Sequence, residues 1–260
     1  MSLEAFNDPL IRKVQEKNIP YSEKNASKIR NEVRKAARVL ERKVFPHGAE
    51  SIVVEAENGD MVIAIRHSPE YISRNEENPT AYIKKQYYLH RILNTLYKDS
   101  FPRIYGSFIK EGEEGSLGTI SGTIREKIIP REEGKKEKNS PPIAPFFLEM
   151  IGDYKQISEE ESKEEVARIK ANQEQIQKFI DIESTLEELG IRISLDTFDS
   201  SNFITDKNGN RFYVDMIRPR TIKPEAREKI KAYMTERGFN ESDIRSVENA
   251  LLRLETETAD

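Results

Sequence analysis

The stretch "LDTFDSSNFITDKNGNRFYVDMI", residues 195–217, gathers oxygen-bearing side chains around a short turn. Two apolar runs, "NFIT" and "RFYVD", flank "DKNG", and this pattern predicts a tight β-hairpin because Asn and Gly accept positive φ. Such a hairpin returns the chain to its starting end, so we expect Asn202 and Asp215 to lie close together. Amide and carboxylate oxygens are ligands that Mg²⁺ accepts. The hairpin is therefore either an ordinary acidic turn or a holder of a metal ion and a phosphate.

Turn formation is the alternative interpretation for most of these side chains. Asp196, Asp199, Asp206 and Asn208 could simply hydrogen-bond nearby backbone groups, as Asp and Asn do in turns. We favour that interpretation for Asp206 and Asn208. Asp215 ends an apolar strand, where a carboxylate is usually exposed or paired, and for this residue we favour a functional role.

The elements that precede this hairpin are predicted from the spacing of apolar residues. Residues 22–45 show helical spacing, and residues 49–67 read as two strands joined by an Asn-Gly-Asp turn. Residues 78–100 return to helical spacing, and two further strands follow within residues 101–129. The predicted order is strand, strand, helix, strand, strand.

The second half of the chain has a different pattern. "REEGKKEKNSPP", residues 131–142, is charged and has almost no apolar content, which indicates a loop or hinge. We expect a long helix from about residue 159 to 189, ended by Gly190. Two more helices are expected near the C-terminus, one from Pro224 to Gly238 and one capped by Asn240.

Composition excludes several classes of protein. The 260 residues include no cysteine, which excludes disulfides, thiolate zinc sites and cysteine nucleophiles and fits a cytoplasmic location. Charged residues make up 34% of the chain but leave a net charge of −4, so no global field attracts nucleic acid. We find no signal-peptide pattern and no apolar run long enough for a membrane span. We therefore expect neither membrane nor nucleic-acid partners.

This organisation resembles the protein-kinase-like superfamily. "VVEAENGDMVIAIR" is similar to the second and third strands of a kinase front lobe, with Arg66 in the place of the lysine of V-A-I-K. "TIREKIIP" is similar to the strand and hinge that contact an adenine, which puts Glu126, Lys127 and Ile128 at the hinge. In kinases an asparagine and an aspartate that bind magnesium are about thirteen residues apart. Asn202 and Asp215 have this spacing (215 − 202 = 13).

The chain also departs from the kinase pattern. The usual base position, five residues before the metal-binding asparagine, is Thr197, so the resemblance leaves Asp196, which we favour, or Asp199 as the base. Gly48 is the only glycine in the expected phosphate-covering loop. The helix that normally supplies a glutamate offers Gln86, Leu89 and His90 instead. His47, His67 and His90 have no metal-ligand spacing and are interpreted as structural residues.

The resemblance implies an α+β, bilobal fold, with a small antiparallel-sheet front lobe, a mostly helical rear lobe and an extra N-terminal helix. The expected segments are a helical extension (1–37), a front lobe (38–130), a charged connector (131–144) and a minimal rear lobe (145–260). It implies ATP and Mg²⁺ as cofactors and a phosphotransferase, of the atypical or small-molecule type, acting on an unknown protein or small-molecule hydroxyl. The alternative is a pseudokinase, a nucleotide-binding or protein-binding scaffold without efficient chemistry.

Overall fold

The computed structural model describes residues 8–19, 25–45, 51–66, 79–111, 117–131, 176–195, 197, 202–215 and 217–256. The chain divides into two units. Unit 1 combines residues Met1–Ile128 with Met234–Asp260, and unit 2 comprises residues Ile129–Tyr233. The fold class is mixed α+β, with antiparallel sheets.

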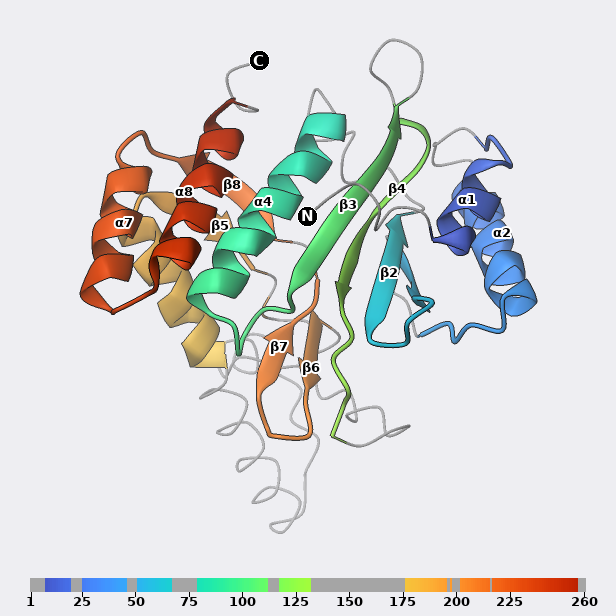
Figure 1. The fold of residues 1–260 in the computed structure, drawn as a ribbon, viewed down its shortest axis with the longest axis horizontal. Helices are drawn as coiled ribbons and strands as arrows, with labels where there is room; N and C mark the ends of the chain where they lie inside the picture. The colour runs from blue at the N-terminus through green and yellow to red at the C-terminus, as the bar shows by residue number, and fades with distance from the viewer. Residues whose placement is uncertain are drawn as a thin grey trace, which may run out of the picture. The chain divides into compact units, whose positions relative to one another are not determined.

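A four-stranded antiparallel sheet forms the centre of unit 1 (Figure 1). Its strands are β1 (Ser51–Glu55), β2 (Met61–Arg66), β3 (Ile104–Glu111) and β4 (Leu117–Glu126). The order is β1-β2-β4-β3, so the last strand in sequence lies beside β2. Residues 43–45 extend the edge at β1, where the Phe45 N–H donates to the Val53 carbonyl at 2.9 Å. The predicted strands and their place before and after a helix are confirmed.

Two glycines are required by this sheet, for different reasons. Gly59 has φ +74° in the β1–β2 turn, as the Asn-Gly-Asp sequence predicts. Gly122 lies within β4 opposite Phe108 and Ile65. A Cβ at Gly122 would stand 2.2 Å from the Ala64 carbonyl oxygen and 2.6 Å from Cζ of Phe108. The missing side chain therefore lets Phe108 cover the centre of the sheet.

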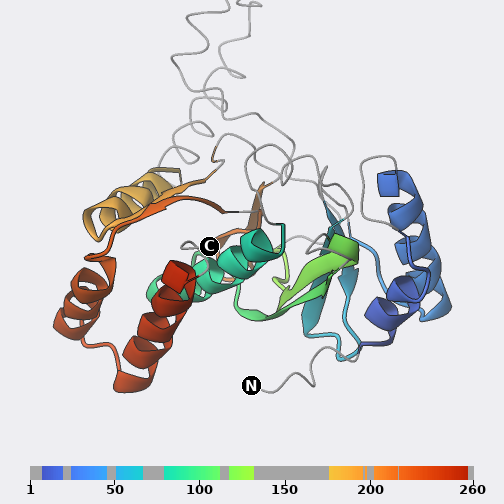
Figure 2. The same ribbon diagram turned by 90° about the horizontal axis from the view of Figure 1, so that it is seen from above.

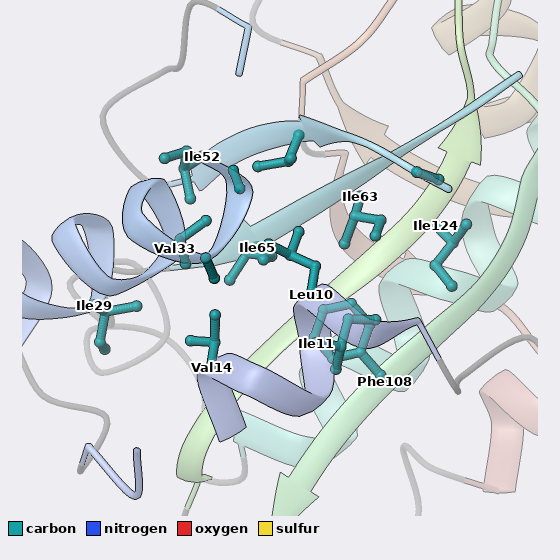
Figure 3. Close-up of a cluster of buried hydrophobic side chains, with 14 of the residues drawn as sticks. Leu10, Ile11, Val14, Ile29, Val33, Ile52, Ile63, Ile65, Phe108 and Ile124 are labelled. Atoms are coloured by element: carbon teal, nitrogen blue, oxygen red, sulfur yellow. The ribbon is translucent and has the colours of Figure 1, made fainter. Parts of the chain in front are cut away.

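One face of the sheet is apolar and lies under α1 (Pro9–Gln15) and α2 (Ala26–Val39) (Figure 2). The Asp8 side chain caps α1 by accepting from the Leu10 N–H at 2.8 Å, and it also pairs with Arg42. Figure 3 shows how the apolar side chains of the two helices and the sheet interlock. This cluster contains Leu10, Ile11, Val14, Ile29, Val33, Ile52, Ile63, Ile65, Phe108 and Ile124. The N-terminal helices are thus part of the core of unit 1.

The other face of the sheet lies under α4 (Pro79–Leu96), which packs against β3 and β4. α8 (Glu241–Thr256) packs against α4 (Figure 2), and Arg91 of α4 donates to the Ser246 hydroxyl at 2.9 Å. α8 begins as predicted, because the Asp243 N–H donates to the Asn240 side chain at 2.9 Å. The expected boundary at residue 145 placed this helix with the second half of the chain. By contacts, residues 234–260 instead join unit 1.

Unit 2 contains a helix at residues 176–188 and α7 (Ala226–Glu236), whose last three residues fall in unit 1. Gly190 follows the first helix with φ +93°, as predicted, and its carbonyl accepts from the Lys223 N–H at 2.8 Å. That bond continues an antiparallel pair between β5 (Ile191–Ser194) and β8 (Arg218–Ile222). This pairing was not predicted, because β8 contains Pro219 and alternates charged with apolar residues only weakly.

The predicted hairpin is present in unit 2 as β6 (Phe203–Thr205) and β7 (Arg211–Tyr213). Phe203 packs on Phe179 of the 176–188 helix, with ring centroids 5.0 Å apart, and on Tyr213 at 5.4 Å. Each contact is edge-on, the arrangement that aromatic rings favour. The hairpin is therefore held by an aromatic cluster as well as by its own turn. The charged connector at 132–144 and the first half of the long predicted helix lie outside the described residues.

Candidate functional site

Asn202 and Asp215 lie together at the open end of the β6–β7 hairpin. Phe203 pairs with Tyr213, and one step further the Val214 N–H donates to the Asn202 carbonyl at 2.8 Å. Asn202 is 8% exposed, whereas Asp215 is exposed to solvent. The thirteen-residue spacing thus returns the two side chains to one end of the hairpin. It leaves one oxygen ligand fixed in the protein and one facing water.

Asp206 acts at the opposite end of the hairpin, and its role is structural. Its carboxylate accepts from the N–H groups of Asn208 and Asn210, at 2.9 and 2.8 Å, and from both of their side-chain amides. These bonds lower the pKa of Asp206, although its partial desolvation works in the opposite direction. Gly209 completes the turn with φ +87°. The turn-forming interpretation of Asp206 and Asn208 is therefore confirmed.

The candidate bases, Asp196 and Asp199, lie outside the described residues, as does Gly48. Their neighbours are described. Thr197, at the usual kinase base position, is buried with 7% exposure and carries no group that titrates near neutral pH. A base in this segment must therefore come from another residue.

Glu183 was missed by the sequence analysis. It lies on the 176–188 helix and its carboxylate accepts from the Leu195 N–H at 2.5 Å, directly before Asp196. Burial raises the pKa of Glu183, and the bond from Leu195 opposes that shift. A signal was available, because Glu183 falls between Ile182 and Leu186 on the predicted buried side of the helix. Glu183 thus fixes the backbone where the acidic stretch begins.

The predicted hinge residues are already bonded within unit 1. The Glu126 N–H donates to the Arg103 carbonyl at 2.8 Å, and the Lys127 N–H donates to the Asp60 carbonyl at 3.1 Å. The Lys127 ammonium contacts the Glu55 carboxylate and the Gly59 carbonyl. These two N–H groups are therefore engaged by the sheet and its turn. Ile128 is half-buried at the end of unit 1.

Arg66 ends β2 and is buried, with 8% exposure, so it is not the surface charge that the sequence left as an alternative. Ile63 and Ile65 point into the apolar cluster under α1 and α2. Because neighbouring strand residues point to opposite faces, Arg66 lies on the α4 side of the sheet. His90 of α4 is fully buried. Burial lowers the pKa of His90 well below 6.5, and the charges of Arg125 and Arg66 lower it further.

A hollow of about 570 Å³ in unit 2 brings two carboxylates and two guanidiniums together. Its lining includes Glu183, Glu187, Arg192 and Arg220, and Arg192 pairs with Glu187 at 3.6 Å. The opposite charges largely balance, so the hollow presents no clear preference for an anion or a cation.

The described part of the chain contains no group of three or more His, Asp and Glu side chains arranged to hold a metal ion. The pair Asn202 and Asp215 offers oxygen donors only, which suits Mg²⁺ but supplies two of its six ligands at most. None of the described helices has the length and apolar character needed to cross a membrane. No protein-family model and no curated protein matches this sequence.

Proposed function

We propose that the chain is an atypical kinase-like phosphotransferase that moves the γ-phosphate of ATP to a hydroxyl acceptor. The observation that carries this proposal is the return of Asn202 and Asp215 to one end of the β6–β7 hairpin. An amide oxygen and a carboxylate would leave most positions around Mg²⁺ for phosphate oxygens and water, as magnesium sites in nucleotide enzymes do. The strand, strand, helix, strand, strand order of unit 1 supports the same reading.

In this proposal Arg66 holds phosphate, Glu126, Lys127 and Ile128 lie near the base, and Asp196 orients the acceptor hydroxyl and takes its proton. Glu183 positions the backbone that leads into Asp196. The bound nucleotide and Mg²⁺ supply the transferable phosphoryl group and neutralise its charge. The protein supplies orientation and a proton acceptor.

A second candidate, a pseudokinase that binds a nucleotide or a protein, is favoured by a different set of observations. Two hinge N–H groups are engaged within the sheet, and the buried groups on α4 beside Arg66 include His90 rather than a carboxylate. The kinase ion pair between a strand lysine and a helix glutamate has no counterpart in these residues.

Nucleotide binding is tested by thermal unfolding with ATP, in the presence and absence of Mg²⁺, because a ligand of the native state raises the unfolding temperature. We expect a Mg²⁺-dependent rise that Asp215→Ala abolishes. Asp60→Ala is the matched control, since Asp60 is also an exposed aspartate at a hairpin of the protein. An equal response of both variants would reject the metal pair.

Turnover separates the two candidates. If Asp196 is the base, Asp196→Asn should lower phosphotransfer or ATP hydrolysis by about 10²-fold or more while nucleotide binding is retained. Asp199→Asn should have a much smaller effect, and the reverse ranking would make Asp199 the base. Nucleotide binding without any turnover would favour the pseudokinase.

A further inference from the structure

Unit 1 contains a polar layer between α4 and the sheet, which we define as Arg66, Gln86, His90, Ser121, Thr123 and Arg125. Five of these residues are at most 8% exposed, and Arg125 is half-buried. The register pairs Val62 with Arg125 and Ala64 with Thr123. Since Ile124 points into the apolar cluster, Ser121, Thr123 and Arg125 point to the α4 side, where Arg66 also lies.

Two members of this layer have buried polar atoms without a hydrogen-bond partner among the described residues. They are His90, at both ring nitrogens, and Ser121, at its hydroxyl. Both residues are 0% exposed. Buried polar atoms are nearly always bonded in native proteins, and an exception often marks a bound water or ion. Two such residues in one layer point to a ligand rather than to an isolated packing defect.

The charge of the layer indicates which ligand fits. Arg66 and Arg125 both contribute positive charge at His90, and the layer contains no carboxylate. The Arg125 guanidinium is held in place by a bond to the Thr123 hydroxyl at 2.9 Å. A neutral imidazole and a serine hydroxyl each offer one donor, and guanidiniums offer several in a planar fork. Donors combined with positive charge select an oxyanion over a cation or a neutral ligand.

We propose that the polar layer of unit 1 is a binding site for a small oxyanion, a phosphate or carboxylate group, held by Arg66 and Arg125 with His90 and Ser121 as donors. This site goes beyond the proposed nucleotide chemistry, because it requires neither Mg²⁺ nor the hairpin of unit 2. The free phosphate ion and the carboxylate of a metabolite share the same recognition, and the experiment distinguishes them.

The first measurement is thermal unfolding of the full chain in sodium phosphate, in sodium acetate and in sodium chloride at equal ionic strength. We expect phosphate or acetate to raise the unfolding temperature above that in chloride, and the stronger of the two identifies the anion class. Arg125→Gln should weaken this binding about tenfold or more, as the loss of one charge-assisted contact does. Arg38→Gln is the matched control, because Arg38 is exposed on α2. No rise in the unmodified protein, or equal losses in both variants, would overturn the proposal.

The second measurement follows the imidazole signals of the three histidines by NMR, with His47→Gln and His67→Gln used to identify His90. In chloride we expect the His90 signal not to titrate between about pH 8 and 6. A bound anion beside Arg66, Arg125, Gln86 and Ser121 favours the protonated ring, so phosphate should raise the pKa of His90 into that range. Asp215→Ala should leave this response intact even if it abolishes the response to ATP and Mg²⁺. A His90 signal that phosphate does not change would reject the site.

Discussion

The two faces of the sheet in unit 1 are both buried, but different forces hold their coverings. α1 and α2 cover one face with aliphatic side chains such as Leu10, Ile11 and Val33, whose contacts need no particular direction. α4 covers the other face, where Arg66, His90 and Ser121 lie in the buried layer. Buried polar groups require partners in defined positions. The apolar face therefore accounts for stability, and the polar face is where a ligand can change it.

The largest effect should come from closing the gap at Gly122 on the apolar face. Gly122→Ala forces its Cβ into the Ala64 carbonyl, a backbone atom that cannot rotate away, and into the Phe108 ring. We expect the free energy of unfolding to fall by about 3 kcal/mol or more. Chemical denaturation measures it.

Gly59→Ala is the matched control for that change. Gly59 has φ +74° but nothing within 4 Å of the added Cβ, so the cost should be only about 1 kcal/mol. Equal losses in the two variants would mean that the close approach at Gly122 is not what limits the sheet.

The second effect tests whether the N-terminal helices belong to the core. Leu10 is 0% exposed, so Leu10→Ala should lower the free energy of unfolding by about 2–5 kcal/mol. Leu252→Ala, at a position 45% exposed on α8, should change it by less than about 0.5 kcal/mol. A loss at Leu10 no larger than that at Leu252 would show that α1 is not part of the folded core.

The polar face should respond to pH. Because the pKa of His90 in the folded state lies well below 6.5, the unfolded state binds more protons as the pH falls below about 6.5. Stability in chloride should therefore decrease on acidification, by about 1.4 kcal/mol between pH 7.5 and 5.5. The measurement is urea denaturation at each pH, and the relevant quantity is the difference between the unmodified protein and His90→Gln. This subtraction removes the contribution of Glu183, whose pKa is shifted upward. Parallel pH profiles of the two proteins would contradict the prediction.

The smallest effect concerns the bond between Arg125 and Thr123. Thr123→Val keeps the shape of the side chain but removes the oxygen that accepts from Arg125 at 2.9 Å. We expect a loss of about 1 kcal/mol in the free energy of unfolding. The same variant should weaken the response to phosphate, because the Arg125 guanidinium is no longer oriented. A change in stability with an unaltered phosphate response would separate the packing role of Thr123 from the oxyanion site.

The sequence predicted those elements of the fold that depend on local signals. The turns at Gly59 and Gly209, the helix end at Gly190 and the cap at Asn240 all follow from the backbone preferences of the residues present. The return of Asn202 towards Asp215 follows from the same turn chemistry. Within each unit, local physics was sufficient to place these elements along the chain.

What the sequence did not predict depends on partners distant along the chain. The pairing of β5 with β8 and the packing of α8 on α4 join segments whose own patterns carry no sign of the partner. The bonds that engage the N–H groups of Glu126 and Lys127 likewise come from Arg103 and Asp60. Periodicity shows which face of a strand or helix is buried, but not what covers it. The roles of Arg66 and His90 needed the sheet register to be known.

The position of α8 has a consequence for how the protein is made. The chain leaves unit 1 after residue 128 and returns to it at residue 234. α8 begins 145 positions after α4 ends (241 − 96 = 145). At a translation rate of about 5–20 residues per second, the side of α4 that α8 covers waits about 7 to 29 s for its partner. During that interval a nascent α4 is a binding surface for a chaperone, and unit 1 acquires its second helical layer only after the ribosome has synthesised all of unit 2.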